Sequence, residues 1–125
     1  MPHRSIHQFR ADRAEGQARV LDTEHLGVKR FFALDSAAYR DATDKGGLPA
    51  TTKELLGLVA SAVLRCNDCI DYHLEQCVAL DLTESQIEDA LNVALVVGGS
   101  IVIPHLRHAR LTLDELLAER AEKSR

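Results

Sequence analysis

Two cysteines and a histidine lie close together in the stretch "RCNDCIDYH" at residues 65–73. Cys66 and Cys69 are three positions apart, and His73 follows the second cysteine by four. On a helix, Cys69 and His73 would be direct neighbours, and Cys66 would lie within ~20° of His73 around the axis. The three side chains could therefore form a redox dithiol with its own proton carrier, hold a metal ion or simply fill a helical core.

The redox interpretation requires a thiolate, which is the nucleophilic form of cysteine. At the start of a helix, unpaired N–H groups and the helix dipole stabilise a thiolate, and His73 could accept or return the thiol proton. Two sulfurs one helical turn apart could also form a disulfide with little backbone movement. The carboxylates of Asp68 and Asp71 act in the opposite direction, because nearby negative charge disfavours a thiolate.

Haem and metal sites fit this stretch less well. Covalent haem attachment requires a histidine directly after the second cysteine, where this chain has Ile70. Cys77 extends the row to four ligand types, but on one helix Cys66 and Cys77 would be roughly 16 Å apart along the axis. Zinc binds each ligand sulfur at about 2.3 Å, so that set could not close around one ion. A strained three-ligand site stays open, but we expect no metal and no cofactor, with Cys77 as a core residue.

The segments that must position these residues are predicted to be helices. The chain of 125 residues is long enough for one domain. It has three Phe, two Tyr and no Trp, so Leu, Val and Ala must fill most of the core, which favours packed helices. We therefore predict an all-α fold of about six helices. The polar residues 1–24 are expected to form an arm, briefly helical, and residues 25–125 the helical domain.

Helical spacing and breaking residues place the predicted helices along the chain. Helical patterns begin at Leu26 and end at the "DATDKGG" stretch; the later ones cover residues 51–65, the cysteine stretch to Val78, residues 84–99, and one or two helices after that. Thr83 and Gln86 have the spacing of a capping box, as do Thr51 and Glu54. Glu54 has a second interpretation, as a carboxylate that folds back to orient or deprotonate the thiol–imidazole pair. Spacing alone leaves both open.

Composition excludes several functions and raises the question of assembly. A net charge of −4 with no basic block argues against nucleic-acid binding. The N-terminus lacks the apolar run expected of a signal peptide, and no segment approaches the length of a membrane span. An odd count of three cysteines indicates a reducing compartment, and we expect the cytoplasm.

The stretch "LNVALVVGGSIVI" is apolar almost all round, which indicates burial in a homo-oligomer or a central core helix. His105 and His108 have the spacing of metal ligands but no obvious partner, so we expect them at the surface.

The same residues carry a family resemblance over roughly residues 46–110. Glu54, Cys66, Cys69 and His73 follow the pattern Glu-x11-Cys-x2-Cys-x3-His, and a glycine pair, Gly98 and Gly99, follows in a later helix. In these features the chain resembles the carboxymuconolactone decarboxylase superfamily, specifically its alkylhydroperoxidase AhpD-like branch. One departure is Asp68, which stands where the peroxidase pattern has a histidine.

The resemblance implies an all-helical fold that assembles into trimers or hexamers, with the site near a subunit interface. It implies that Cys69 is the thiolate that attacks peroxide, that Cys66 forms a disulfide with it, and that His73 and Glu54 form a proton relay. The predicted function is a thiol-dependent antioxidant oxidoreductase acting on a small hydroperoxide or disulfide. A dithiol donor, either a lipoyl group or a thioredoxin-like protein, would regenerate it.

Two other functions stay open at this point. One is a decarboxylase-like lyase acting on a small lactone acid, although the decarboxylases of the family typically lack the cysteine pair. The other is a non-catalytic oligomeric redox sensor or scaffold.

Overall fold

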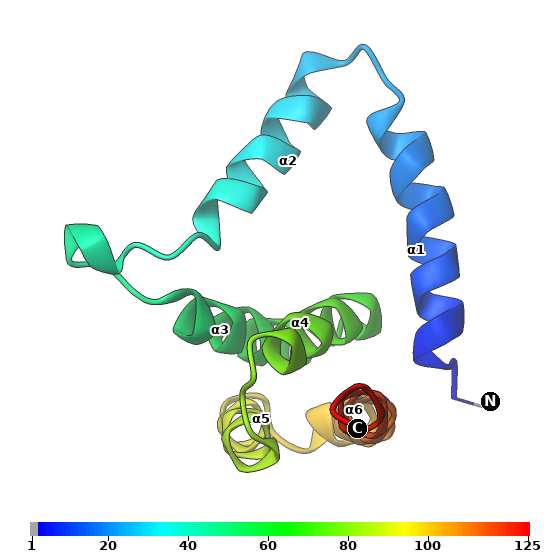
Figure 1. Ribbon diagram of the computed structural model, residues 1–125, viewed down its shortest axis with the longest axis vertical. Coiled ribbons are helices and arrows are strands. Elements are labelled where there is room, and N and C mark those ends of the chain that lie inside the picture. The colour runs from blue at the N-terminus through cyan, green and yellow to red at the C-terminus, as the bar shows by residue number, and fades with distance from the viewer. Residues whose placement is uncertain (1–2) are drawn as a thin grey trace.

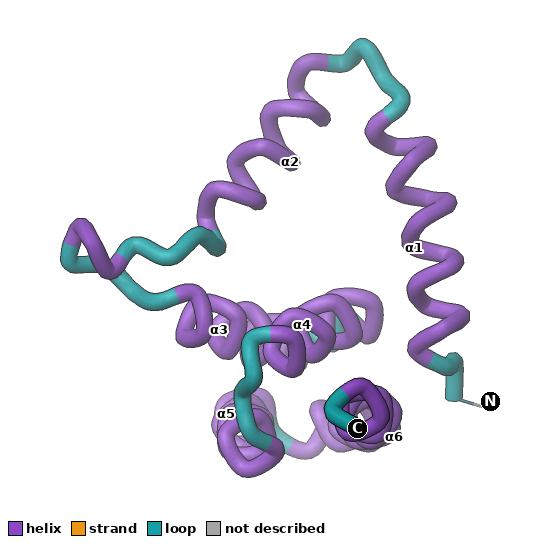
Figure 2. Tube along the Cα trace, in the orientation of Figure 1, coloured by secondary structure: helices purple, strands orange, loops and turns teal. Residues whose placement is uncertain are grey.

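The computed structural model describes residues 3–125, which form six α-helices and two short 3₁₀ turns (Figures 1 and 2). No strand occurs among these described residues, so the prediction of an all-α fold with about six helices is confirmed. The α-helices are α1 (Ile6–Leu21), α2 (Leu26–Ala38), α3 (Ala50–Val63), α4 (Asn67–Ala79), α5 (Glu84–Gly98) and α6 (Ile103–Lys123). The 3₁₀ turns are η1 (Thr43–Lys45) and η2 (Ser100–Val102).

Helices α3 to α6 form the packed part of the molecule. In Figure 1, α3 and α4 lie across the view while α5 and α6 are seen end-on beside them. Helix α3 packs on α4 and α5, and α4 also packs on α6. The side chains at the centre are aliphatic and fully buried, among them Leu58, Ile70, Leu74, Ile87 and Leu113. Helix α4, which carries the cysteine stretch, is therefore held between α3 and α6.

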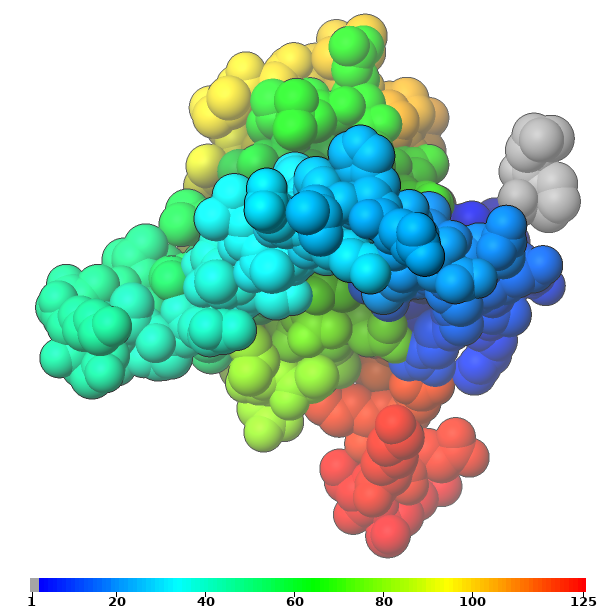
Figure 3. Space-filling model, turned by 90° about the horizontal axis from the view of Figure 1, so that it is seen from above, coloured from blue at the N-terminus to red at the C-terminus, as the bar shows by residue number. Residues whose placement is uncertain are grey.

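Helices α1 and α2 form an arch that stands away from this bundle (Figure 1). Seen from above, the arch lies across the bundle on the side of α4 (Figure 3). Helix α1 is 16 residues long, more than the brief helix expected in residues 1–24, and its Ile6 and Phe9 are buried in the core. None of residues 26–38 of α2, all of which the structure describes, is buried. The start of α1 is thus anchored, whereas α2 exposes apolar side chains.

The two predicted capping boxes have different outcomes. At the start of α5, Thr83 and Gln86 exchange reciprocal hydrogen bonds, so this box is confirmed. The box predicted from Thr51 and Glu54 is wrong, because α3 begins at Ala50 after Pro49 and has no side-chain cap bond among its described residues. The side chain of Glu54 instead turns toward α4, where it enters the candidate site.

Large apolar side chains are exposed on several helices. They include Leu26, Phe31 and Leu34 on α2 and Val93, Val96, Val97 and Ile101 on α5 and η2, and others lie on α1, α3 and α6. Large exposed apolar patches often mark sites of protein–protein contact. Across residues 3–125, no helix combines the length and the apolar character needed to cross a membrane.

Candidate functional site

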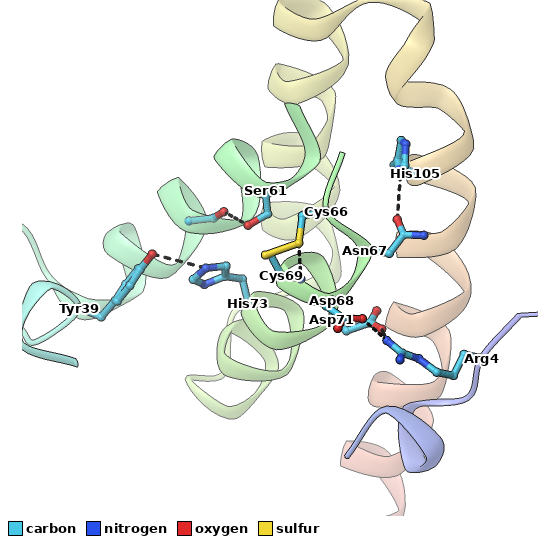
Figure 4. The surroundings of a disulfide bond; sticks show 11 residues. Arg4, Tyr39, Ser61, Cys66, Asn67, Asp68, Cys69, Asp71, His73 and His105 are labelled. Carbon is cyan, nitrogen blue, oxygen red and sulfur yellow. Dashed lines mark hydrogen bonds and ion pairs between the residues drawn. A yellow bond between two sulfur atoms is a disulfide. The ribbon is translucent and has the colours of Figure 1, made fainter. Parts of the chain in front are cut away.

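The cysteine pair lies at the head of α4, as the sequence predicted. Arg65, with a left-handed φ of 61°, turns the chain from α3 into α4. Cys66 is the N-cap residue of α4, and its Sγ accepts a hydrogen bond from the backbone N–H of Cys69 at 3.2 Å. The two cysteines form a disulfide, with Cα atoms 5.3 Å apart (Figure 4). The Cys66 sulfur thus occupies the position where a helix N-terminus stabilises negative charge.

The two sulfurs differ in their access to solvent. Cys69 is exposed, whereas Cys66 is half-buried. Cys69 also lines a cavity of 440 Å³ between α1, α2 and α4, together with His73 and the rings of Tyr39 and Tyr72. A small molecule in this cavity would therefore meet the Cys69 sulfur beside an imidazole.

His73 is held from α3 by Glu54. Its Nδ1 lies 2.8 Å from Oε2 of Glu54, and both side chains are buried, with 9% and 7% of their surfaces exposed. Because a carboxylate accepts hydrogen bonds, Nδ1 is the donor, which leaves Nε2 of the neutral ring as an acceptor. Of the four predicted site residues, Cys69 and His73 thus line the cavity, while Cys66 is bonded to Cys69 and Glu54 contacts His73 from α3.

Tyr39, the residue that follows α2, contacts His73 at the ring nitrogen that does not face Glu54. Its hydroxyl lies 3.5 Å from Nε2 of His73 (Figure 4). Burial, together with the charges of Asp35 and Glu54, raises the pKa of Tyr39. The phenol therefore stays protonated at neutral pH and can donate to Nε2. Among the described residues, His73 makes no hydrogen bond to either sulfur, so proton exchange with Cys69 would pass through the cavity that both line.

A second polar cluster lies on the opposite side of α4. Asp71 is fully buried, and its Oδ1 accepts hydrogen bonds from Thr112 at 2.9 Å and from His108 at 2.7 Å. The expectation that His108 lies at the surface is wrong, because only 13% of its side chain is exposed. His105 is partly exposed and lies 2.8 Å from Oδ1 of Asn67. Within residues 3–125, no three His, Cys, Asp or Glu side chains converge as metal ligands.

The remaining cysteine belongs to the core. Cys77 is fully buried, as expected, and burial together with the charge of Glu54 raises the pKa of its thiol to about 12. Two neighbours of the site were not predicted: Tyr39 beside His73, and Arg4, which pairs with Asp68. Neither has a local signal in the sequence, because each comes from a segment far from residue 66 along the chain.

Comparison with known proteins points to one family. The sequence model of the carboxymuconolactone decarboxylase family matches residues 28–111. A solved structure from Thermotoga maritima is 50% identical, covers 94% of this chain and 95% of its own, and superposes with a TM-score of 0.83. That protein is described as a carboxymuconolactone decarboxylase family member, with a role in the antioxidative response raised as a possibility.

More distant relatives add support for the fold. A carboxymuconolactone decarboxylase family protein from Legionella pneumophila is 22% identical over 89% of this chain and 96% of its own, with a TM-score of 0.79. A protein of Cupriavidus necator without a characterised function is 33% identical over 58 residues, which are 46% of this chain and about half (51%) of that protein. An uncharacterised protein of the cox locus of Paracoccus denitrificans is 29% identical over 82% of this chain and 91% of its own.

Proposed function

Because this chain belongs to the carboxymuconolactone decarboxylase family and holds a cysteine pair beside a buried histidine–glutamate pair, we propose that it is a thiol-dependent antioxidant oxidoreductase of the alkylhydroperoxidase type. The observation that carries the proposal is the position of Cys69. Its exposed sulfur is bonded to Cys66 and lines the same cavity as His73. The antioxidative role raised for the Thermotoga maritima relative supports the same reaction class.

In the oxidative half of the reaction, Cys69 transfers its proton to His73 and attacks a hydroperoxide as the thiolate. The O–O bond breaks, one oxygen becomes part of a sulfenic acid on Cys69, and the other leaves as an alkoxide. His73 returns the proton to this alkoxide, which departs as an alcohol. Glu54, 2.8 Å from Nδ1, stabilises the histidine while it carries the extra proton.

Cys66 completes the transfer of two electrons. Its thiolate attacks the sulfenic sulfur of Cys69, the S–S bond forms, and the S–O bond breaks, so that hydroxide leaves and is protonated to water. The N–H of Cys69 and the start of α4 stabilise this thiolate before it attacks. The same contact makes Cys66 a good leaving group when the disulfide is later opened.

A dithiol donor would return the site to its reduced form. The donor's thiolate attacks the exposed Cys69 sulfur, Cys66 leaves as a thiolate, and the donor's second thiol displaces Cys69 from the mixed disulfide. A lipoyl group or a thioredoxin-like protein has the required chemistry. Such donors are kept reduced in the cytoplasm, which is where we propose that the protein acts.

We also propose that the protein is a homo-oligomer, a trimer or a hexamer. The support is the exposed apolar surface of α2 and α5, which another copy of the chain would cover. The cavity beside Cys69 is lined in part by α2, so assembly through α2 would also fix the position of this helix beside the cavity.

Single serine replacements at each cysteine test the reaction. In a peroxide-consumption assay with a dithiol donor, Cys69→Ser is expected to abolish turnover. Cys66→Ser should consume one equivalent of peroxide and stop as the sulfenic acid, which mass spectrometry detects as one added oxygen. Cys77→Ser is the matched control, since Cys77 does not reach the cavity. Unchanged turnover in both Cys66→Ser and Cys69→Ser would refute the mechanism.

Two further measurements, of lyase activity after thiol alkylation and of the state of assembly, separate the alternatives. A lyase acting on a lactone acid would keep its activity after every accessible thiol is alkylated. A redox sensor would consume peroxide slowly and would change its state of assembly when the disulfide forms.

A further inference from the structure

The proposed nucleophile is flanked by two carboxylates on α4. Asp68 directly precedes Cys69, and Asp71 follows it by two residues. The side chain of Asp71 is only 1% exposed, and its buried Oδ2 has no hydrogen-bond partner among the described residues. Both negative charges oppose ionisation of the Cys69 thiol, and water cannot screen the buried one.

A single cation reaches both carboxylates. The guanidinium of Arg4, in the segment before α1, donates a hydrogen bond to Oδ1 of Asp68, and the same Nη2 lies 3.6 Å from Oδ2 of Asp71 (Figure 4). This contact with Asp68 is the main reason that the pKa of Arg4 is raised, so the guanidinium remains charged. Arg4, Asp68 and Cys69 also line the same cavity.

The other polar groups around Asp68 and Asp71 do not contact both carboxylates as Arg4 does. On α6, His108 and Thr112 bind Oδ1 of Asp71, and Oδ2 faces Arg4. Other charged or titratable neighbours are Asp12 on α1, 3.6 Å from Arg4, His3, whose ring centroid lies 4.8 Å from that of His108, and Arg107, which lines a neighbouring cavity with Asp68. The cavity beside Cys69 is also lined by Arg13 on α1 and Asp35 on α2, together with Tyr39, Tyr72 and His73. Arg4 is the residue in contact with both acids that flank the nucleophile.

We propose that Arg4 is a positioning residue that offsets the charges of Asp68 and Asp71 and so keeps Cys69 in its ionised, reactive form. The inference rests on the proposed function, because the reaction with peroxide is what requires a reactive thiolate. The effect of Arg4 on the thiol of Cys69 can nevertheless be measured without peroxide or a donor. Because Arg4 acts through two intervening carboxylates, of which Asp68 is exposed to solvent, its loss is expected to raise the pKa of Cys69 by about 0.5 to 1 unit. Below that pKa, the thiol would then be alkylated about three- to tenfold more slowly.

The test uses the full chain carrying Cys66→Ser. Serine retains the capping function at this position, and Cys69 becomes the accessible thiol because Cys77 is buried. The rate of alkylation by iodoacetamide, measured by mass spectrometry from pH 5 to pH 10, gives the pKa of Cys69. Four further changes are compared in this background: Arg4→Gln, Arg4→Lys, Asp68→Asn, and Arg19→Gln as the control. Arg19 is exposed in the last turn of α1, pairs with Asp22 and does not line the cavity.

Charge compensation predicts a specific pattern. Arg4→Gln raises the pKa of Cys69, Arg4→Lys preserves most of the parent value, Arg19→Gln changes nothing, and Asp68→Asn lowers the pKa. In the Asp68→Asn background, Arg4→Gln should have a smaller effect, because one of its two partners is already neutral. An unchanged pKa in Arg4→Gln, or equal shifts in Arg4→Gln and Arg4→Lys, would overturn the inference. If this pattern holds but the native protein consumes no peroxide, Arg4 keeps its assigned role and the peroxidase proposal fails.

Discussion

Gly57 lies against the ring of His73. A Cβ built at Gly57 would be 2.5 Å from Cε1 of the histidine, closer than any side chain tolerates. Glycine at this position of α3 therefore leaves the space in which the imidazole reaches Glu54, one turn earlier on the same helix. The contact between His73 and Glu54 therefore depends on the absence of a side chain at Gly57 as well as on the two residues themselves.

Gly57→Ala is expected to push the His73 ring out of place. Although alanine favours helices, crowding in a packed region should lower the free energy of unfolding by about 1–3 kcal/mol. The peroxide reaction of Cys69 should slow at the same time. Denaturant unfolding and peroxide consumption measure the two effects. Gly16→Ala in α1 is the control for stability alone, because Gly16 lines the cavity: its Cβ would meet nothing within 4 Å, so up to about 1 kcal/mol of stabilisation is expected. Equal behaviour of the two variants would show that the contact imposes no constraint.

Glu54→Gln removes the charge beside His73 while keeping the size of the side chain. The protonated histidine would lose its buried counter-ion, so we expect oxidation of Cys69 by peroxide to slow by up to about 10²-fold. Quenched-flow mass spectrometry of the sulfenic acid and disulfide follows this step directly. Glu24→Gln, at an exposed position between α1 and α2, is expected to have no effect. A full rate in Glu54→Gln would remove Glu54 from the proposed relay.

Cys77 is expected to resist modification in the folded protein. Its thiol is fully buried, and burial with the charge of Glu54 raises its pKa to about 12. Iodoacetamide at pH 8 should therefore label Cys66 and Cys69 of the reduced native chain, but all three cysteines after denaturation. Peptide mass spectrometry distinguishes the positions. Labelling of Cys77 at the rate of Cys69 in the native state would contradict the burial seen here.

Glu119 is expected to make stability depend on pH in the acid range. Arg10 donates hydrogen bonds to both of its carboxylate oxygens, at 2.7 and 2.8 Å, and this contact lowers the pKa of Glu119 from its usual 4.5. The contribution is therefore complete above about pH 4.5 and is lost as the pH falls through the lower folded-state value. Because the pair is partly exposed, its size should be at most about 1 kcal/mol.

Unfolding experiments between pH 2 and pH 7 measure this contribution. The difference in stability between the native chain and Glu119→Gln should shrink as the pH falls below 4.5. Glu122→Gln, an exposed position on the same helix, serves as the reference. A difference that stays constant with pH would mean that the Arg10–Glu119 contact does not form in solution.

Val96→Lys tests assembly through α5. Val96 is 76% exposed in the single chain, and burying a charge there should oppose association. Light scattering is expected to give the native chain a mass that is a multiple of 13.8 kDa, and the variant a smaller one. Ser85→Lys, near the start of the same helix, should leave the mass unchanged. A monomeric native protein would reject the oligomer proposal.

The sequence alone was sufficient to predict the helices from Leu26 onward and the local geometry of the cysteine stretch, whereas α1 is longer than the brief helix expected in residues 1–24. Helical periodicity and the Thr83–Gln86 capping box depend on residues within one or two turns. Such local signals do not depend on how the rest of the chain packs. For the same reason, the spacing of Cys66, Cys69 and His73 was enough to place two sulfurs within reach of a disulfide at the head of a helix, near a histidine. The disulfide itself was implied by the family resemblance.

Only the tertiary structure decided which partners these residues have. Local spacing left Glu54 open between the end of a capping box and a partner of the thiol–imidazole pair. Packing of α3 against α4 directs it to His73, 19 positions away, as the family resemblance implied. Packing of α6 on α4 likewise brings His108 from an expected surface position to Asp71, and the start of the chain brings Arg4 to Asp68. A helix's sequence specifies which residues share a face. Which helix faces pack against each other depends on how the apolar stripes of all the helices are buried together, and this burial involves the whole fold.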